Sequence, residues 1–354
     1  MCCSEVASSN YRKSQRHLTD TSILKVRKRV AWESMKTLGV SIILPILNEE
    51  RHLADTVSAI LAQEYAGETE VILALGPSID RTNEIAADLA AADSRIILVS
   101  NPTGRTAAGL NAAIAKSQFP IICRIDGHAE INQSYVSDAV RILQEQDAVN
   151  VGGVMAAEGR TTFERSVATA MRSKLGVGSS RFHTGGEAGP SDTVYLGTFK
   201  KDALLGAGGF DERFTRAQDW ELNFRLRSQG GLVWFDPSLK VTYRPRSTLK
   251  ALAKQYFQYG RWRRAVSRSH KGSVNYRYLA PPTAVLILAA SLLGGLFLHP
   301  IFYIPLLTYL LAILAGSLLI GRTWKEKIVL PAVLMTMHIV WGIGYLTSPK
   351  NLLR

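Results

Sequence analysis

Cysteine is scarce in this sequence, and the three cysteines present form no recognisable pattern. Cys2, Cys3 and Cys123 have neither a metal-ligand spacing nor a pairing suited to disulfides, which fits a reducing compartment. Residues 1–38 are basic but lack the apolar stretch that a cleavable secretory signal needs. We therefore expect a basic, flexible N-terminal tail, on which Cys2 and Cys3 could carry lipid, and a globular part that stays in the cytosol.

Familiar nucleotide- and nucleic-acid-binding signatures are also missing. The chain has no Gly-x-Gly-x-x-Gly and no Walker loop, which argues against a Rossmann dinucleotide site or a P-loop. Its formal net charge is +13, but it has no basic motif interleaved with aromatic residues as in RNA-binding domains. This charge suits nucleic acid or an anionic membrane surface, and the apolar C-terminal part favours the membrane. We expect no nucleic-acid partner.

Charge is almost absent from residues 279–346, which divide into three apolar spans, 279–298, 301–320 and 328–346. At ~1.5 Å per residue, about 20 helical residues reach the ~30 Å of a bilayer core. The flanking segments 261–277 and 322–327 are basic, so the positive-inside rule places both in the cytosol, and His299 and Arg354 outside. The alternative is a buried helical subdomain or a re-entrant hairpin.

Alternating strand and helix patterns begin at Gly39. Buried apolar runs predict strands at 40–47, 69–75, 95–100 and 119–126, and amphipathic spacing predicts helices at 50–63, 80–92 and 106–117. Strands that alternate with helices of this length indicate an α/β fold with a mostly parallel sheet and right-handed crossovers. A fold of this kind suits nucleotides, but it does not by itself define a function.

Polar residues follow these strands where each one ends. They are Asn48 and Glu49, Asp80, Arg105, and finally Asp126 with His128. Open α/β sheets bind ligands at the carboxyl ends of their strands, so these side chains are candidates for one pocket. A carboxylate there can accept hydrogen bonds from a ribose or a base, and Arg105 can approach a phosphate.

The segment Asp126-Gly-His128 follows the apolar run 119–123. An Asp at i and a His at i+2 extend from a strand end in the same direction, so one divalent ion could contact both and hold a diphosphate. The alternative is an ordinary strand exit in which Asp126 caps the next segment.

Several short motifs occur in a characteristic order between Val40 and Trp262. They are Pro45-Ile-Leu-Asn48-Glu49-Glu50, Gly76-Pro-Ser-Ile-Asp80-Arg-Thr82, Asn101-Pro-Thr-Gly-Arg105, Asp126-Gly-His128, Gly197-Thr-Phe, Gly208-Gly-Phe-Asp211-Glu212 and Gln218-Asp219-Trp220-Glu221. In this order they resemble the family 2 glycosyltransferases of GT-A fold. Each motif is weak alone, but together they are specific.

The resemblance implies a donor site for a nucleotide sugar. Pro45, Asn48, Glu49 and Asp80 match positions that line the nucleotide pocket of the family. Asp126 matches the first Asp of the Asp-x-Asp motif, whose metal bridges the donor diphosphate. His128 stands where a second Asp is common, and neutral imidazole binds Mn²⁺ better than Mg²⁺. The expected cofactor is therefore a divalent metal, Mg²⁺ or Mn²⁺, held by Asp126 and His128.

The resemblance also makes Asp219 the candidate catalytic base. Inverting transfer needs one carboxylate that removes the proton of the acceptor hydroxyl as its oxygen attacks the anomeric carbon. The family usually has Glu before this Asp, whereas this chain has Gln218, and Glu221 could substitute in part. The local alternative is that Asp219 only caps a helix over 220–229.

Residues 247–268 predict an amphipathic helix at a membrane surface, with basic residues along one stripe and apolar residues along another. Within it, Gln258, Arg261 and Trp262 fit the Gln-x-x-Arg-Trp motif that related membrane synthases use near the acceptor and diphosphate. A plain interfacial helix would equally explain Arg261 and Trp262.

The resemblance is strongest to bacterial transferases of the succinoglycan-biosynthesis glucosyltransferase type. It implies an inverting transferase of the inner membrane, multi-pass and with a cytosolic catalytic domain, that moves sugar from a UDP-sugar to a polyprenyl-linked glycan. The expected parts are the tail, a GT-A domain (39–246), an interfacial segment (247–278) and transmembrane helices (279–348). The alternatives are a non-catalytic scaffold that binds nucleotide sugar, and a transferase to polyprenyl phosphate itself. The sequence leaves the oligomeric state open.

Overall fold

The computed structural model describes residues 38–353, so the expectations for the N-terminal tail, for Cys2 and Cys3, and for Arg354 lie outside the described residues. A single mixed sheet of nine strands forms the centre of the domain, with neighbours in the order β3-β2-β1-β4-β8-β6-β9-β5, and β7 pairs with β9. The strands are β1 (Val40–Ile46), β2 (Thr69–Leu75), β3 (Ile96–Ser100), β4 (Ile121–Arg124), β5 (Glu130–Ile131), β6 (Asn150–Ala157), β7 (Gly189–Pro190), β8 (Tyr195–Lys200) and β9 (Val233–Tyr243).

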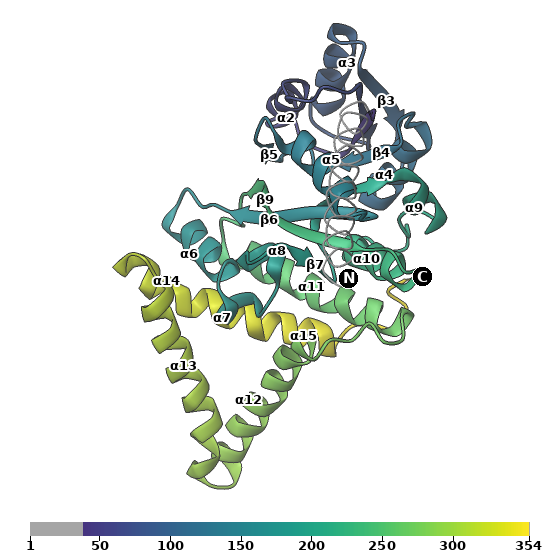
Figure 1. Ribbon diagram of the computed structural model, residues 1–354. Coiled ribbons are helices and arrows are strands. Elements are labelled where there is room, and N and C mark those ends of the chain that lie inside the picture. The colour runs from purple at the N-terminus through teal and green to yellow at the C-terminus, as the bar shows by residue number, and fades with distance from the viewer. Residues whose placement is uncertain (1–37, 354) are drawn as a thin grey trace, which may run out of the picture.

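Helices cover this sheet and continue beyond it at the C-terminal end (Figure 1). Those before the last strand are α2 (Leu53–Leu61), α3 (Thr82–Ala92), α4 (Thr106–Lys116), α5 (Tyr135–Glu145), α6 (Thr162–Met171), α7 (Lys174–Val177), α8 (Arg181–Thr184), α9 (Lys201–Gly206) and α10 (Gln218–Ser228). Those after it are α11 (Leu249–Ser269), α12 (Ala280–Phe297), α13 (Ile304–Ile320), α14 (Trp324–Met335) and α15 (Trp341–Leu346), with a π-helical turn at Thr336–Val340 between the last two.

The first half of the sheet is the parallel α/β unit that the sequence predicts. β1 pairs in parallel with β2 and β4, and β2 with β3. Helix α2 begins at Leu53, three residues later than predicted, because residues 48–50 form a loop whose backbone N–H groups bond to the loop after β2. The delayed start of this helix leaves Asn48 and Glu49 at the rim of the sheet.

The second half of the sheet is mixed, and the sequence predicts it only in part. β8 is antiparallel to both β4 and β6, whereas β6 and β9 are parallel. The apolar sequence Leu232-Val-Trp-Phe235 predicts a strand at 232–235, but β9 extends to Tyr243. The extension bends at a register shift beside Gly153, where a Cβ atom would lie 1.7 Å from the Leu239 carbonyl oxygen. Glycine is therefore required at this crossing.

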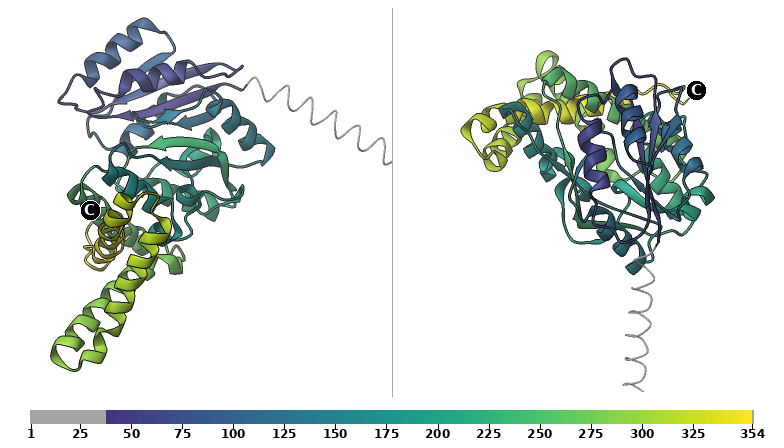
Figure 2. Two further views of the ribbon diagram at one scale, coloured as in Figure 1. Left: turned by 90° about the vertical axis from the view of Figure 1, so that its left-hand side faces the viewer. Right: turned by 90° about the horizontal axis from the view of Figure 1, so that it is seen from above.

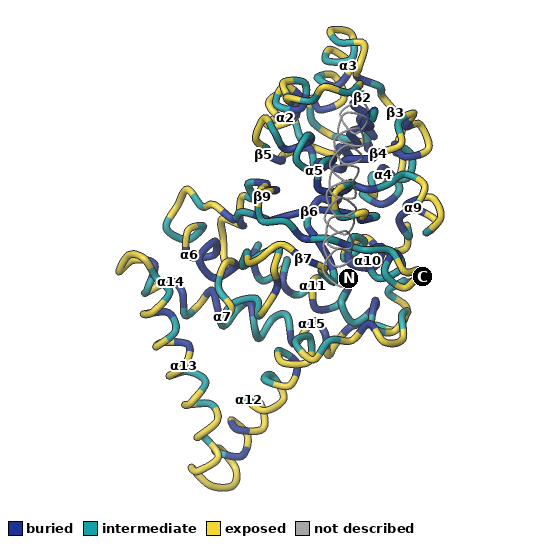
Figure 3. Tube along the Cα trace, viewed as in Figure 1, coloured by how far each residue is buried: buried dark blue, intermediate teal, exposed yellow. Residues whose placement is uncertain are grey.

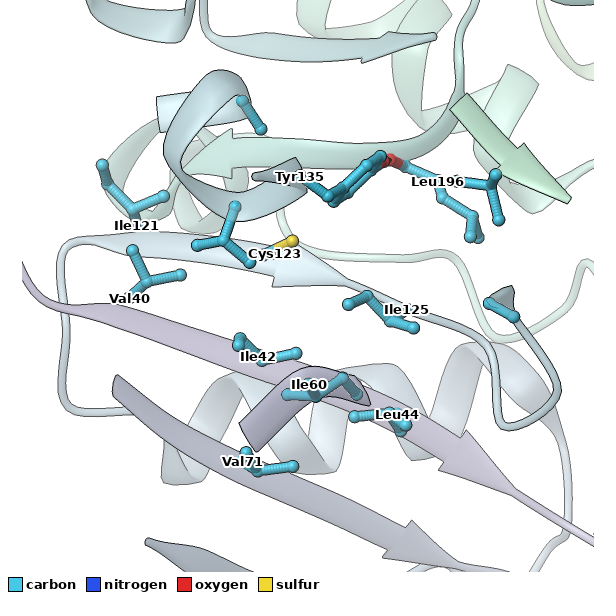
Figure 4. Packing of buried hydrophobic residues seen from close by; sticks show 14 of the residues in the cluster. Val40, Ile42, Leu44, Ile60, Val71, Ile121, Cys123, Ile125, Tyr135 and Leu196 are labelled. Atoms are coloured by element: carbon cyan, nitrogen blue, oxygen red, sulfur yellow. The ribbon is translucent and has the colours of Figure 1, made fainter. Parts of the chain in front are cut away.

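Apolar side chains of alternate strand residues form a core on each face of the sheet. On one face, Ile42 and Leu44 of β1 pack with Cys123 of β4 and Tyr135 of α5, whose hydroxyl donates to the Leu196 carbonyl over 3.2 Å (Figure 4). Burial raises the pKa of the Cys123 thiol to about 11, so this cysteine stays protonated and serves as packing. Because β4 is held in this core, the residues that follow it have a fixed position.

Three helical stretches are long and apolar enough to cross a membrane: Tyr276–Phe297, Pro300–Ile320 and Trp324–Leu346. Helices α12 and α13 form a hairpin that extends away from the domain, and most of its residues are exposed (Figures 2 and 3). The third stretch differs from the other two in its burial. Of the residues in its 18-residue apolar segment, 39% are buried inside the protein, against 17% and 11% in the first and second stretches. It runs along the domain, with α14 on α6 and α15 on α11.

Glycines allow the third stretch to approach the domain so closely. A Cβ atom at Gly260 of α11 would lie 2.0 Å from the Trp341 carbonyl oxygen, and one at Gly344 would lie 2.2 Å from that of Phe257. Beyond α15, the Ser348 hydroxyl donates to the Arg261 carbonyl over 2.9 Å, and Leu352 and Leu353 pack against the domain. Residues 348–353 therefore lie against the domain that contains the sheet.

Candidate active site

The site is built around Arg124, the last residue of β4, whose side chain is only 4% exposed. Its Nε and Nη2 donate to the same oxygen of Asp126 over 3.1 and 3.0 Å, and its Nη1 donates to Asp219. The carboxylates that the sequence predicts as metal ligand and catalytic base therefore bind one guanidinium, although they are 93 residues apart in the chain (219 − 126). Asp126 is not used as a cap.

Asp219 lies in the first turn of α10, where a carboxylate interacts favourably with the helix dipole. Ala217, two residues before Asp219, is the N-cap residue of α10 and has a left-handed backbone conformation with φ 60°. The Asp219 side chain is 34% exposed and bonds to Arg124 instead of capping its own helix, so it is open to a substrate. Burial raises the pKa of Asp219, and the positive charge of Arg124 opposes that shift.

The loops after β1 and β2 are joined by hydrogen bonds that use the predicted donor-site residues. Asn48, at φ 56°, accepts from the Ile79 N–H over 2.9 Å, and the Glu49 N–H donates to the Thr82 hydroxyl over 2.7 Å. Asp80 accepts from the same hydroxyl over 2.5 Å and from the Thr82 N–H, and these bonds lower the pKa of Asp80. Asn48, Glu49 and Asp80 thus lie together at the rim.

Glu49 also reaches the segment after β4. Its carboxylate lies 2.8 Å from His128 Nδ1, and this contact raises the pKa of His128. Gly127 makes the approach possible, since a Cβ atom there would lie 2.8 Å from Ile46 and 3.0 Å from Glu49. A carboxylate on Nδ1 fixes the ring so that Nε2 remains free for a ligand.

The side chains of the site supply only part of the ligands that a divalent metal needs. Within residues 38–353, no group of three or more His, Cys, Asp or Glu side chains is arranged to hold an ion. Asp126 and His128 supply one carboxylate oxygen and one imidazole nitrogen. Mg²⁺ sites that act on nucleotides often use one or two protein ligands and complete their shell with phosphate oxygens and water. The pair therefore suits a metal that arrives with a diphosphate.

The other predicted site residues, all within residues 38–353, form no hydrogen bond to Arg124, Asp126 or Asp219. Pro45 lies within β1 and pairs with Ala74, while Arg105 precedes α4 with an exposed side chain. In the amphipathic helix, Trp262 is buried against Phe214. Gln258 and Arg261 do not line the cavity beside Asp219, and the Arg261 guanidinium lies over the Phe257 ring instead.

Glu221 is fully buried and has a different role from the one suggested by the sequence. It accepts two hydrogen bonds of 2.7 Å from Arg225 and lies 2.9 Å from His270 Nε2. Arg225 in turn donates to the carbonyls of Ala207 and Gly209, at the start of the motif Gly208-Gly-Phe-Asp211-Glu212. Glu221 therefore stabilises the fold beneath Asp219 and does not pair with it.

A cavity of about 670 Å³ opens beside Asp219, between the catalytic domain and the start of α12. Its lining includes aromatic residues of α11, the segment 276–281 and the π-helical turn. Sequence reasoning missed both this cavity and the role of Arg124. The sequence pattern that could have indicated Arg124 is its position: it is a charged residue at the end of an apolar strand, shortly before the motif Asp126-Gly-His128.

The fold is the GT-A fold of nucleotide-sugar-dependent glycosyltransferases. The structure is similar to that of the mannosyltransferase PcManGT from Pyrobaculum calidifontis in complex with GDP-Man and Mn²⁺, with a TM-score of 0.56, 21% identity and coverage of 85% of this chain and 87% of that one. Residues 41–204 match Glycosyl transferase family 2, and the protein carries a glycosyltransferase domain of this family.

Two relatives match over most of their length. The succinoglycan biosynthesis protein ExoA of Rhizobium meliloti is 28% identical over 308 residues, which cover 86% of this chain and 93% of that protein. The dolichyl N-acetyl-alpha-D-glucosaminyl phosphate 3-beta-D-2,3-diacetamido-2,3-dideoxy-beta-D-glucuronosyltransferase of Methanococcus voltae is 25% identical over 321 residues, 86% of this chain and 95% of that one. The prediction of an enzyme of this family is confirmed, and so is the GT-A fold.

Proposed function

We propose that the protein is a membrane-anchored inverting transferase that moves a sugar from a nucleoside diphosphate sugar, of the UDP class, to a polyprenyl-linked glycan in polysaccharide synthesis. One observation carries the proposal: Arg124 joins Asp126 to Asp219 beside a cavity that leads to the apolar helices. The names of the two relatives support a surface polysaccharide pathway and a lipid-linked acceptor.

In this proposal Asp219 acts on the acceptor. Its carboxylate removes the proton from the acceptor hydroxyl while that oxygen attacks the anomeric carbon, and the nucleoside diphosphate leaves from the opposite face. Arg124 holds Asp219 in position and neutralises part of its charge. The new glycosidic bond therefore has the inverted configuration.

The nucleoside of the donor is assigned to the rim formed by Asn48, Glu49 and Asp80, with Pro45 at its border, and Arg105 is assigned to the phosphates. Asp126 and His128 would hold a divalent metal, which, when bound, stabilises negative charge on the leaving diphosphate. Glu49 keeps the His128 ring oriented for that contact. Of the motif Gln258, Arg261 and Trp262, only Trp262 is assigned to the acceptor side, because it borders the cavity and the other two do not.

For the membrane part, we propose that α12 and α13 insert as a hairpin and that the third apolar stretch lies along the domain. The burial of that stretch and the contacts of residues 348–353 with the domain support this arrangement. The chain then crosses the membrane twice, with His299 at the far side and the catalytic domain in the cytosol. The basic loop 322–327 lies on the same side as the domain, in agreement with the positive-inside rule.

The test is a donor screen on membranes that contain the full chain, with UDP- and GDP-sugars and a polyprenyl-linked glycan acceptor. We expect one donor to give metal-dependent release of nucleoside diphosphate and a product sugar of inverted configuration. Asp126→Ala should lose both nucleotide binding and transfer. Transfer to polyprenyl phosphate itself, or no transfer from any donor, would contradict the proposed acceptor.

A further inference from the structure

The cavity beside Asp219 connects three parts of the molecule. Asp219 and Trp220 border it on the side of the active site, Tyr259 and Arg263 of α11 form one wall, and Pro281 belongs to the first turn of α12. A ligand in it can therefore contact the candidate base at one end and the first helix of the hairpin at the other. Its volume of about 670 Å³ lies in the range of small-molecule sites.

Positive charge predominates in this cavity. Four cationic side chains line it, Lys174, Arg216, Arg263 and Arg277, against the single carboxylate of Asp219, which already bonds to Arg124. Arg277 forms an ion pair of 2.5 Å with Asp192. Within residues 38–353, the other three cations have no carboxylate partner. The cavity therefore favours an anionic ligand.

Arg263 is the cation most suited to bind it. Its guanidinium lies between two aromatic rings, with the carbon Cζ 4.3 Å from the centre of Trp220 and 4.2 Å from that of Tyr278. The rings hold the group by cation–π contacts but accept none of its in-plane hydrogen bonds. Nη1 is buried and, among the described residues, has no hydrogen-bond partner. An anionic oxygen would satisfy it.

The rest of the lining is largely apolar and aromatic. It includes Phe182, Val194, Trp262, Met337 and Trp341. An inorganic anion has no groups to match these side chains. The combination of a planar cation with an apolar wall next to a membrane hairpin fits a lipid whose phosphate follows directly on a hydrocarbon chain.

We propose that this cavity binds the phosphate and the adjoining isoprene units of a prenyl phosphate lipid, with Arg263 as the phosphate ligand. The assignment rests on the proposed function, because it makes this lipid the carrier of the acceptor sugar. The phosphate lies at Arg263, the hydrocarbon chain leaves along α12, and the sugar attached to the phosphate extends to Asp219. No residue of the donor rim takes part.

The first test is binding of farnesyl phosphate to the full chain in detergent micelles. We expect Arg263→Gln to weaken it by about tenfold, as the loss of one charge-assisted hydrogen bond implies. Arg264→Gln is the matched control, because this arginine loses the same charge on the same helix but bonds to the Tyr345 hydroxyl and does not line the cavity. It should bind as the wild type does.

Farnesol and inorganic phosphate should each bind at least about tenfold more weakly than farnesyl phosphate. Equal binding of farnesol, displacement by phosphatidylglycerol at equal concentration, or an unchanged affinity in Arg263→Gln would overturn the assignment. If Arg263→Gln fails to bind donor nucleotide, and so is misfolded, Arg263→Lys decides in its place. Lysine keeps the positive charge but lacks the planar guanidinium with its Nη1 donor, so an affinity equal to that of the wild type would overturn the assignment.

A second readout separates this proposal from the proposed function. In the transfer assay, Arg263→Gln should raise KM for the lipid-linked acceptor with little change in KM for the donor. If the wild type binds farnesyl phosphate through Arg263 but transfers no sugar to any polyprenyl-linked acceptor, the proposed function fails and the cavity assignment stands. If transfer occurs and Arg263→Gln leaves both KM values unchanged, the cavity assignment fails and the function stands.

Discussion

Arg124 and Asp219 form an ion pair that links the end of β4 to the first turn of α10. Since Arg124 also holds Asp126, movement of the buried guanidinium would displace both carboxylates together. Arg124 therefore couples the position of Asp126, the candidate metal ligand, to that of Asp219, the candidate base.

Asp219→Asn should reduce transfer by about 10²–10⁴-fold, the usual contribution of a positioned general base. The amide keeps the shape of the side chain but cannot accept the proton, so nucleotide binding should persist. The measurement is single-turnover transfer beside nucleotide affinity. Asp202→Asn, an exposed carboxylate on α9, is the control, and equal losses in the two variants would refute the role of Asp219.

Arg124→Gln should move the acid limb of the pH–rate profile to higher pH. Asp219 works as a base only when ionised, so the rate falls as pH decreases through its pKa. Burial raises that pKa and the charge of Arg124 lowers it, so removing the charge raises it further. Arg124→Lys keeps the charge and should shift the limb less. An acid limb that is the same in all three proteins would disprove the coupling.

Glu221→Gln should destabilise the protein by about 3–5 kcal/mol, because it leaves Arg225 without its buried carboxylate partner. The measurement is the free energy of unfolding in denaturant. Glu145→Gln removes a carboxylate from an exposed pair with Arg141 and should cost about 1 kcal/mol or less. Similar losses in both variants would mean that Glu221 is not the support beneath α10.

His183 should make the protein less stable in acid. Burial lowers the pKa of this side chain to about 3, whereas in the unfolded chain it is near 6.5. Below pH ~6.5 the unfolded chain therefore binds a proton that the folded protein does not, and stability is lost as pH falls from there towards about 3. His183→Gln should flatten Tm against pH in this window, while an unchanged slope would contradict the assignment.

Two cysteine variants test the path of the chain through the membrane. In a background without Cys2 and Cys3, His299→Cys should react with an impermeant maleimide from outside the cell. Asn351→Cys should react only after permeabilisation, as should Asp202→Cys in the catalytic domain. Cys123 is buried and gives little background. Labelling of Asn351→Cys from outside would show that the third stretch crosses the membrane.

The sequence predicts the parallel half of the fold well because its signals are local. Apolar runs and helical spacing define β1 to β4 and their helices within a few residues. The antiparallel strands β6 and β8 escape prediction, since their pairing depends on partners far along the chain. The same limit applies to the site. The motifs locate Asp126 and Asp219, but only the folded chain shows that Arg124 joins them.

The third apolar stretch illustrates a further limit. Its length and hydropathy match those of a membrane span. Composition alone cannot distinguish a helix that crosses the membrane from one that lies along the domain. The proposal that this stretch lies along the domain rests on the close approach of Gly260 and Gly344 to neighbouring backbones, which depends on the tertiary structure.

This contact between α11 and α15 has a consequence for the product. If the hairpin inserts as proposed, the contact of α15 with α11 would hold Asp219 at one height above the bilayer. A lipid-linked glycan can present its terminal hydroxyl at that height only if it has the right number of sugars. The enzyme would then measure the length of its acceptor, and adding one unit would carry the new terminus out of reach, so that each chain is extended once.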